Sequence, residues 1–95
     1  MMRPSDFRHQ VSQSAKKLYW SDVIADIEDR FPPAFHALAV ETVIYYLPAE
    51  ICDLPDKESR RAVIDSIPDD CEPSHAKQLI IEGTKVLWRK NAVRS

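Results

Sequence analysis

The balance of proline and glycine is the feature that most restricts how this chain can fold. The 95 residues include seven prolines and one glycine. Tight β-hairpins depend on glycine for positive φ angles, whereas proline suits the first turn of a helix and the segment that follows one. The sequence therefore predicts an all-α fold: a compact bundle or orthogonal array of four to five short helices in a single domain, 1–95.

Five helices are predicted between the prolines, from apolar residues that recur at helical spacing. Serine and aspartate favour the start of a helix, because their side-chain oxygens accept hydrogen bonds from free backbone N–H groups. The expected caps are Ser5, Ser21 and Asp53. The expected helices span residues 5–18, 21–31, 33–47, 53–66 and 74–91. Gly83 lies on the inward stripe of the last helix, which predicts close approach of another part of the backbone there.

The most apolar stretch, RFPPAFHALAVETVIYYLP at residues 30–48, is expected to form a largely buried central helix. Its uninterrupted part, residues 33–47, has 15 residues, whereas a membrane-spanning helix needs about 20. We therefore expect no membrane insertion. His36 is interpreted as a partly buried histidine at the helix end. Because residues 40–47 are rich in β-formers, a small α+β fold with a strand there stays open as an alternative.

Charge is unevenly distributed, although the formal net charge is only −2 and the sequence pI is about 5.9. The two ends are basic and the middle of this small acidic protein carries most of the acids. The N-terminal residues lack the apolar core of a signal peptide, so a cytoplasmic protein is expected, with Cys52 and Cys71 as reduced thiols. The basic ends are expected either to fold over the acidic middle or to present separate charged surfaces.

Signatures of enzymes and cofactor sites are weak in this sequence. Phosphate-cradling loops need several glycines, and the one glycine here falls within a predicted helix. Zinc ligands can be assembled from Cys52, Cys71 and His75, with His36 or His9 as the fourth. Structural zinc sites usually show paired ligands on one turn, and Cys71 and His75 form only one loose pair. No catalytic residue, metal ligand or cofactor is therefore predicted.

An acidic stripe on the second predicted helix carries the main functional hypothesis. Asp22, Asp26 and Asp29 share one face at i, i+4 and i+7, and Trp20 and Tyr45 are aromatic residues of the kind that anchor interfaces. These five residues predict a non-enzymatic protein-interaction module that binds a partner with a basic surface, or a second copy of the chain. Small helical proteins with an acidic face are common among adaptors and among inhibitors encoded by mobile elements.

Two alternatives from other functional classes stay open. The last predicted helix and the residues just after it carry four cations around an indole, which suits phosphate contacts and base stacking in a nucleic-acid-binding protein. Those residues are Lys85, Trp88, Arg89, Lys90 and Arg94. The acidic pI counts against this hypothesis. In the second alternative, the helical carboxylates of the acidic stripe hold Mg²⁺ in a metal-dependent phosphohydrolase.

Overall fold

The chain folds into helices throughout the part that the computed structural model describes, residues 4–71 and 74–94. In chain order the elements are α1 (Pro4–Ala15), α2 (Trp20–Arg30), the 3₁₀ helix η1 (Pro33–Phe35), α3 (His36–Cys52), α4 (Lys57–Asp65) and α5 (Ala76–Arg94). These described residues contain no strand, so the all-α prediction is confirmed. The alternative strand at 40–47 is wrong, because burial of that segment against its neighbours outweighs its β-propensity.

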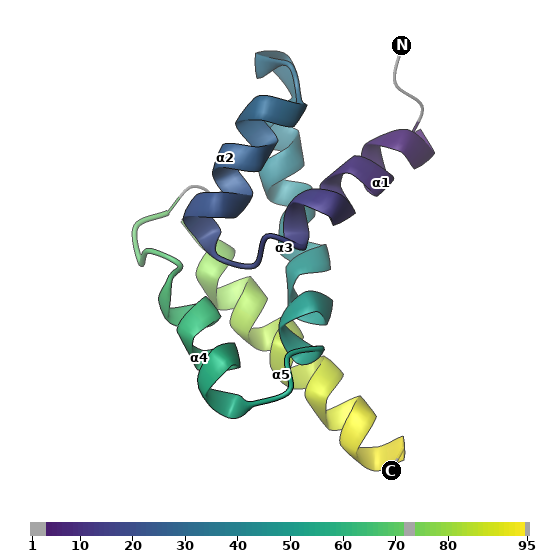
Figure 1. Cartoon of the computed structure of the whole chain (residues 1–95), viewed down its shortest axis with the longest axis vertical. Coiled ribbons are helices and arrows are strands. Elements are labelled where there is room, and N and C mark those ends of the chain that lie inside the picture. Colours follow the sequence, from purple (N-terminus) through teal and green to yellow (C-terminus); the bar gives the residue numbers. More distant parts are fainter. Residues whose placement is uncertain (1–3, 72–73, 95) are drawn as a thin grey trace.

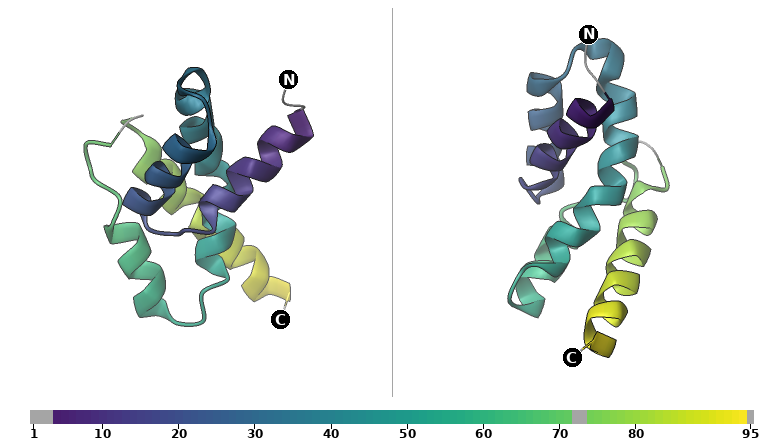
Figure 2. Two further views of the ribbon diagram at one scale, coloured as in Figure 1. Left: turned by 45° about the horizontal axis from the view of Figure 1, so that its top comes forward. Right: turned by 90° about the vertical axis from the view of Figure 1, so that its right-hand side faces the viewer.

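Helix α3 is the central element of the fold (Figure 1). It contacts α1, α2, α4 and α5. In Figure 2, α1 and α2 lie beside the first half of α3, and α5 lies along its second half. The apolar core follows this arrangement. Its fully buried side chains include Val11, Val23, Ile27, Val43, Leu47, Ile51, Val63, Ile67 and Ile80.

Some residues predicted to face inward are exposed. Leu38 is 51% exposed and Phe35 is 41% exposed, because α1 and α2 cover only one side of the first half of α3. Ala62 of α4 is also exposed, and Leu79 of α5 is 38% exposed. Thr84 lies at a buried position of α5 instead, where its hydroxyl donates to the backbone oxygen of Ile80 at 2.7 Å.

The first two helices begin and end differently from the predictions. Helix α1 ends at Ala15 rather than Leu18, and Leu18 has a φ of 70°, a left-handed conformation that stops a helix. Ser5 lies inside α1 rather than at its cap. Ser21 does not cap α2 either, because that helix begins at Trp20. The N–H of Trp20 donates to Oγ of Ser66, 3.2 Å away, at the end of α4.

Pro48 was expected to end the third helix, yet it lies inside α3, which continues to Cys52. A proline in a helix interior removes one backbone hydrogen bond and costs about 3 kcal/mol. Ile44, Leu47 and Ile51 are all buried around it, so core packing on both sides of Pro48 keeps the segment helical. Gly83 of α5 faces the ring of Pro48, so the close approach at this glycine involves a proline side chain rather than the backbone that was predicted.

Helix α4 begins later than predicted. Its N-cap is Asp56 rather than Asp53, and Oδ1 of Asp56 accepts from the backbone N–H of Ser59 at 2.6 Å. This hydrogen bond lowers the pKa of Asp56. Asp53 follows the last residue of α3, and its N–H donates to the oxygen of Ala49. Asp53, which was expected to open α4, is therefore the C-cap of the longer α3 instead.

Helix α5 begins at Ala76 rather than near Ser74, which lies in the preceding turn. Pro73, also expected at this start, lies outside the described residues. Among the described residues, no helix has both the length and the apolar character needed to cross a bilayer.

Candidate functional site

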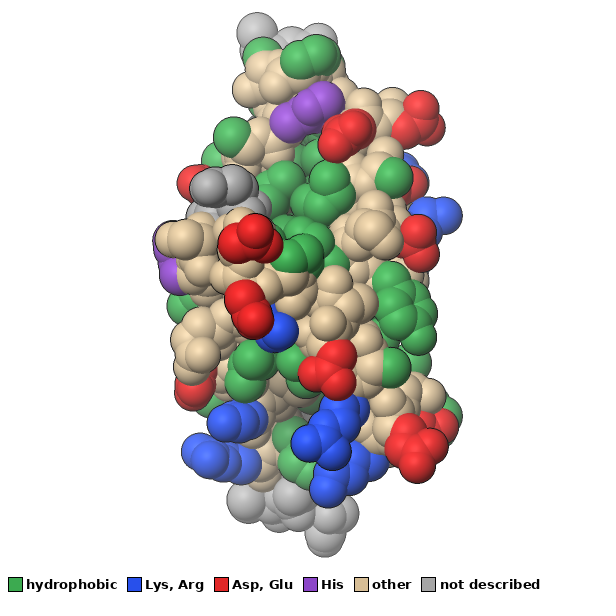
Figure 3. All heavy atoms as spheres, turned by 90° about the vertical axis from the view of Figure 1, so that its left-hand side faces the viewer, with side chains coloured by type: hydrophobic (Ala, Val, Ile, Leu, Met, Phe, Trp, Pro, Cys, Tyr) green, Lys and Arg blue, Asp and Glu red, His purple; other side chains and the backbone are tan. Residues whose placement is uncertain are grey.

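Helices α4 and α5 line a groove of about 710 Å³. Cations line it from both sides, whereas aliphatic side chains, Thr84 and the indole of Trp88 supply its other surface. The groove cations are Lys57, Arg60, Arg61, Lys85 and Arg89. Asp65 is the acid in this lining. Figure 3 shows Lys and Arg side chains gathered in two groups near the lower end of the molecule, with hydrophobic side chains between them.

Arg60 and Trp88 connect the two walls of the groove. The guanidinium carbon of Arg60 lies 4.2 Å from the ring centroid of Trp88, at the distance of a cation–π contact. Nη1 of Arg60 also donates to the backbone oxygen of Leu54 at 2.9 Å. These two contacts fix the guanidinium between the helices, and its remaining N–H groups are donors for an anion.

The other groove cations lack carboxylate partners. In the described part of the chain the ion pairs are Asp26 with Arg30 and Asp69 with Lys77, and neither pair includes a groove cation. Positive charge therefore accumulates along the groove without direct neutralisation, although the whole chain is weakly acidic. A surface of this kind attracts anionic groups and raises their association rate.

The groove includes three of the residues proposed for nucleic-acid binding. Lys85, Trp88 and Arg89 all line it, and Trp88 is 47% exposed. Lys90 is exposed on α5 but is not part of the lining, and the side chain of Arg94 lies outside the described residues.

Sequence reasoning missed the α4 wall of the groove. Lys57, Arg60 and Arg61 fall on one helical face with Ile64, at i, i+3, i+4 and i+7. That spacing was a readable signal. The surrounding acids obscured it, and only the folded chain places this face against α5.

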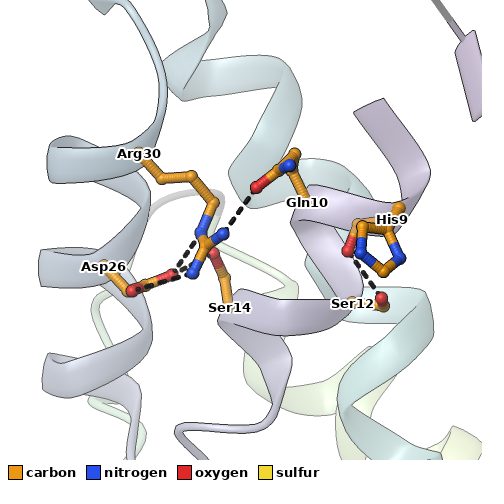
Figure 4. Close-up of polar contacts among 6 residues, drawn as sticks. All are labelled: His9, Gln10, Ser12, Ser14, Asp26 and Arg30. Carbon is orange, nitrogen blue, oxygen red and sulfur yellow. Dashed lines mark hydrogen bonds and ion pairs between the residues drawn. The ribbon is translucent and has the colours of Figure 1, made fainter. Parts of the chain in front are cut away.

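The predicted acidic stripe is only partly available to a partner. Asp22 and Asp29 are exposed, but Asp26 faces α1, where it accepts from Oγ of Ser14 at 2.6 Å and from Nε of Arg30 at 2.9 Å. Arg30 also donates to the side chain of Gln10, so the network joins α1 and α2 (Figure 4). The hydrogen bond from Arg30 lowers the pKa of Asp26. The side chain of Asp26 therefore helps to hold α1 against α2.

The two aromatic residues grouped with the acidic stripe have opposite environments. Trp20 is 5% exposed and belongs to the core, so its interpretation as an exposed anchor is wrong. The chain turns at Leu18 and starts α2 at Trp20, which directs the indole inward. Tyr45 is 75% exposed. It lines a second hollow of about 420 Å³ between α3 and the start of α5, together with Leu38, Leu79 and His75.

The candidate zinc ligands are used in separate contacts. Sγ of Cys52 donates to the backbone oxygen of Thr84 at 3.5 Å, and burial raises the pKa of this thiol. Cys71 is buried, while His75 is exposed. His36 is half-buried at the start of α3, as predicted, with Nε2 located 2.8 Å from the backbone oxygen of Phe31. Among the described residues, no three His, Cys, Asp or Glu side chains are grouped to hold a metal ion.

Comparison of the chain with protein-family models, with curated proteins and with solved structures gave no match.

Proposed function

We propose that this protein is a non-enzymatic interaction module that binds a protein partner in the groove between α4 and α5. The supporting observation is the groove itself, where five cations that form no ion pair with a described carboxylate surround an apolar surface. Its partner would carry an acidic segment that also presents apolar side chains. Binding would act by occluding that segment or by bridging it to another protein, as an adaptor or an inhibitor does. We place this activity in the cytoplasm, where both thiols stay reduced.

The lining of the groove favours a protein segment over a nucleic acid. Ile64 and Ile81 offer aliphatic surface that apolar side chains can bury and that a phosphate backbone does not use. Asp65 repels phosphates at the same place. The net charge of −2 also weakens the general attraction that dedicated nucleic-acid-binding domains exert on a polyanion.

A single-stranded nucleic acid is the second candidate partner, because Trp88 is half-exposed among the groove cations. An exposed indole beside cations can stack on a base while the cations contact phosphates. This candidate predicts a steep loss of affinity with salt, in proportion to the number of phosphates contacted.

The acidic face of α2 stays a proposed docking surface for a basic partner, or for a second copy of the chain, with Asp22 and Asp29 as its exposed acids. Charge attraction would steer such a partner, while Tyr45 would supply apolar contact on another part of the surface. Replacing both aspartates by lysine should then weaken capture of that partner and leave the melting temperature unchanged. Unchanged capture would remove α2 from consideration.

Affinity capture with groove variants tests the main proposal. The variant K85E/R89E reverses two exposed groove cations, and R8E/K16E makes the same change of net charge on and just after α1. We expect the first variant to lose the partner and the second to keep it, with and without nuclease treatment. Loss of the partner on nuclease treatment would favour the nucleic-acid candidate. Capture that survives K85E/R89E would contradict binding in the groove.

A further inference from the structure

We infer that the groove binds an amphipathic acidic peptide segment in one orientation, with its acids toward the start of α4 and its apolar side chains between Ile64 and Ile81. This inference rests on the proposed function, because it names the chemistry and the direction of the partner segment. It follows from the order of residues along the two walls.

The two walls run in opposite directions (Figure 1). The contact between Arg60 and Trp88 fixes their register, because it places the first turn of α4 beside the later part of α5. Lys57 and Arg89 therefore lie toward this same end of the groove. On α4, Ile64 lies four residues beyond Arg60, a distance of about 6 Å along the helix. Ile81 precedes Trp88 on α5, so it lies toward the same end as Ile64, the second end of the groove.

The first end of the groove, at the start of α4, has a guanidinium in position to bind a carboxylate. Stacking on Trp88 and the hydrogen bond to the oxygen of Leu54 already fix the guanidinium of Arg60. An anion that binds there does not have to order this side chain, so less conformational entropy is lost on binding. A guanidinium with free N–H groups also donates to the two oxygens of a carboxylate side by side.

The second end is less favourable for a carboxylate than the first, although Arg61 lies one turn from Asp65 and Lys85 one turn from Ile81. Ile64 and Ile81 are half-buried there and provide aliphatic surface, while Asp65 adds a negative charge. A segment with acids along its whole length would bring one of them close to Asp65. A segment with acids in one half and apolar side chains in the other matches both ends, which sets the direction of binding.

The size of the groove limits the length of the segment. Helix α4 has nine residues, Lys57–Asp65, and is therefore about 13 Å long. A helical ligand lying along it would contact the groove with about nine residues, or two and a half turns. Two clusters, one acidic and one apolar, fit within that length.

Two peptide designs of identical composition, made as three synthetic peptides, test the orientation. Each has 14 residues, four glutamates, four leucines and no tryptophan. The graded peptide, made in both chain directions, has the glutamates in one half, and the symmetric peptide has two glutamates at each end. Titration is followed by calorimetry and by the emission of Trp88, with Trp88→Phe identifying the fluorescence signal. We expect one direction of the graded peptide to bind at least about threefold more tightly than the symmetric peptide.

Asp65→Asn supplies the decisive variant, since it keeps the shape of the side chain and removes its charge. We expect this variant to show a smaller preference between the peptides, whereas R8E/K16E should keep the preference of the original chain. Equal affinities in the original chain, with both peptides weakened by K85E/R89E, would overturn the orientation and leave the proposed function standing. A preference that Asp65→Asn leaves undiminished would also overturn it. Binding of neither peptide, with binding of a 15-nucleotide thymidine strand, would overturn the orientation and the proposed function together.

Discussion

A Cβ atom placed on Gly83 would lie 2.9 Å from Cγ of Pro48 and 3.3 Å from its Cβ. The two residues bring α5 against α3 at the point where α3 carries a buried proline. Glycine costs about 1 kcal/mol in a helix relative to alanine, so its presence here reflects the space that the proline ring occupies.

Gly83→Ala should therefore destabilise the fold, although alanine is the better helix former. Overpacking of a core typically costs about 1–3 kcal/mol, which exceeds the gain in helix propensity. Urea unfolding measures the free-energy change directly. In a Pro48→Ala background the same substitution should cost less, because the nearest ring atom is gone. An equal cost in both backgrounds would show that Pro48 is not the obstacle.

Acid should weaken the contact between α1 and α2 through Asp26. Its pKa is lower in the folded chain than the unfolded value of about 3.9, because Arg30 and Ser14 bond its carboxylate. The carboxylate contributes its full stabilisation above the unfolded value and loses it as the pH falls through the folded value. Asp26→Asn should cost about 1 kcal/mol at pH 7 and flatten the acid dependence of unfolding. Asp22→Asn, at an exposed position of the same helix, is the control and should change neither.

Two nearby aspartates should differ in their effect on α4. Asp56→Ala removes the side-chain acceptor for the N–H of Ser59 and should lower the melting temperature by about 3–5 °C. Asp53→Ala should leave it nearly unchanged, because the side chain of Asp53 does not cap the helix. Thermal denaturation followed by circular dichroism compares them. A larger loss with Asp53→Ala would move the start of α4 back to the position predicted from the sequence.

Replacement of the two tryptophans should affect the stability of the fold very differently. Trp20→Ala removes a buried indole and should cost about 3–5 kcal/mol, enough to unfold much of the chain. Trp88→Ala should cost about 0.5–1 kcal/mol, the strength of its exposed contact with Arg60. Far-ultraviolet circular dichroism in urea measures both. Iodide should quench Trp88 alone in the folded protein, and quenching of Trp20 would contradict its burial.

The thiols should react slowly in the folded protein. Burial raises the pKa of Cys52, so less thiolate is present at neutral pH than in a free cysteine. Reaction with Ellman's reagent at pH 7.5 should be slow in buffer and fast in urea. Rapid modification of Cys52 without denaturant would contradict its partial burial between α3 and α5 and its raised pKa.

The all-α class was predictable because periodic apolar residues and scarce glycine are local features of the sequence. Helix boundaries were harder to predict where distant residues decide them. Pro48 stays inside α3 because neighbours on both sides are buried, and Trp20 starts α2 with an acceptor from α4. Only one wall of the groove was predictable. The cations of α5 form a cluster in the sequence, but their position opposite Arg60 depends on tertiary packing.

The hydrogen bond from the N–H of Trp20 to Oγ of Ser66 spans 46 residues of sequence. Helix α2 lacks a side-chain cap of its own, so its first turn is complete only after the end of α4 has reached it. Ser66 is in turn held by its own hydroxyl, which donates to the oxygen of Val63 at 2.6 Å. The start of α2 and the end of α4 should consequently gain protection from hydrogen exchange together, as one cooperative folding unit joined across the chain.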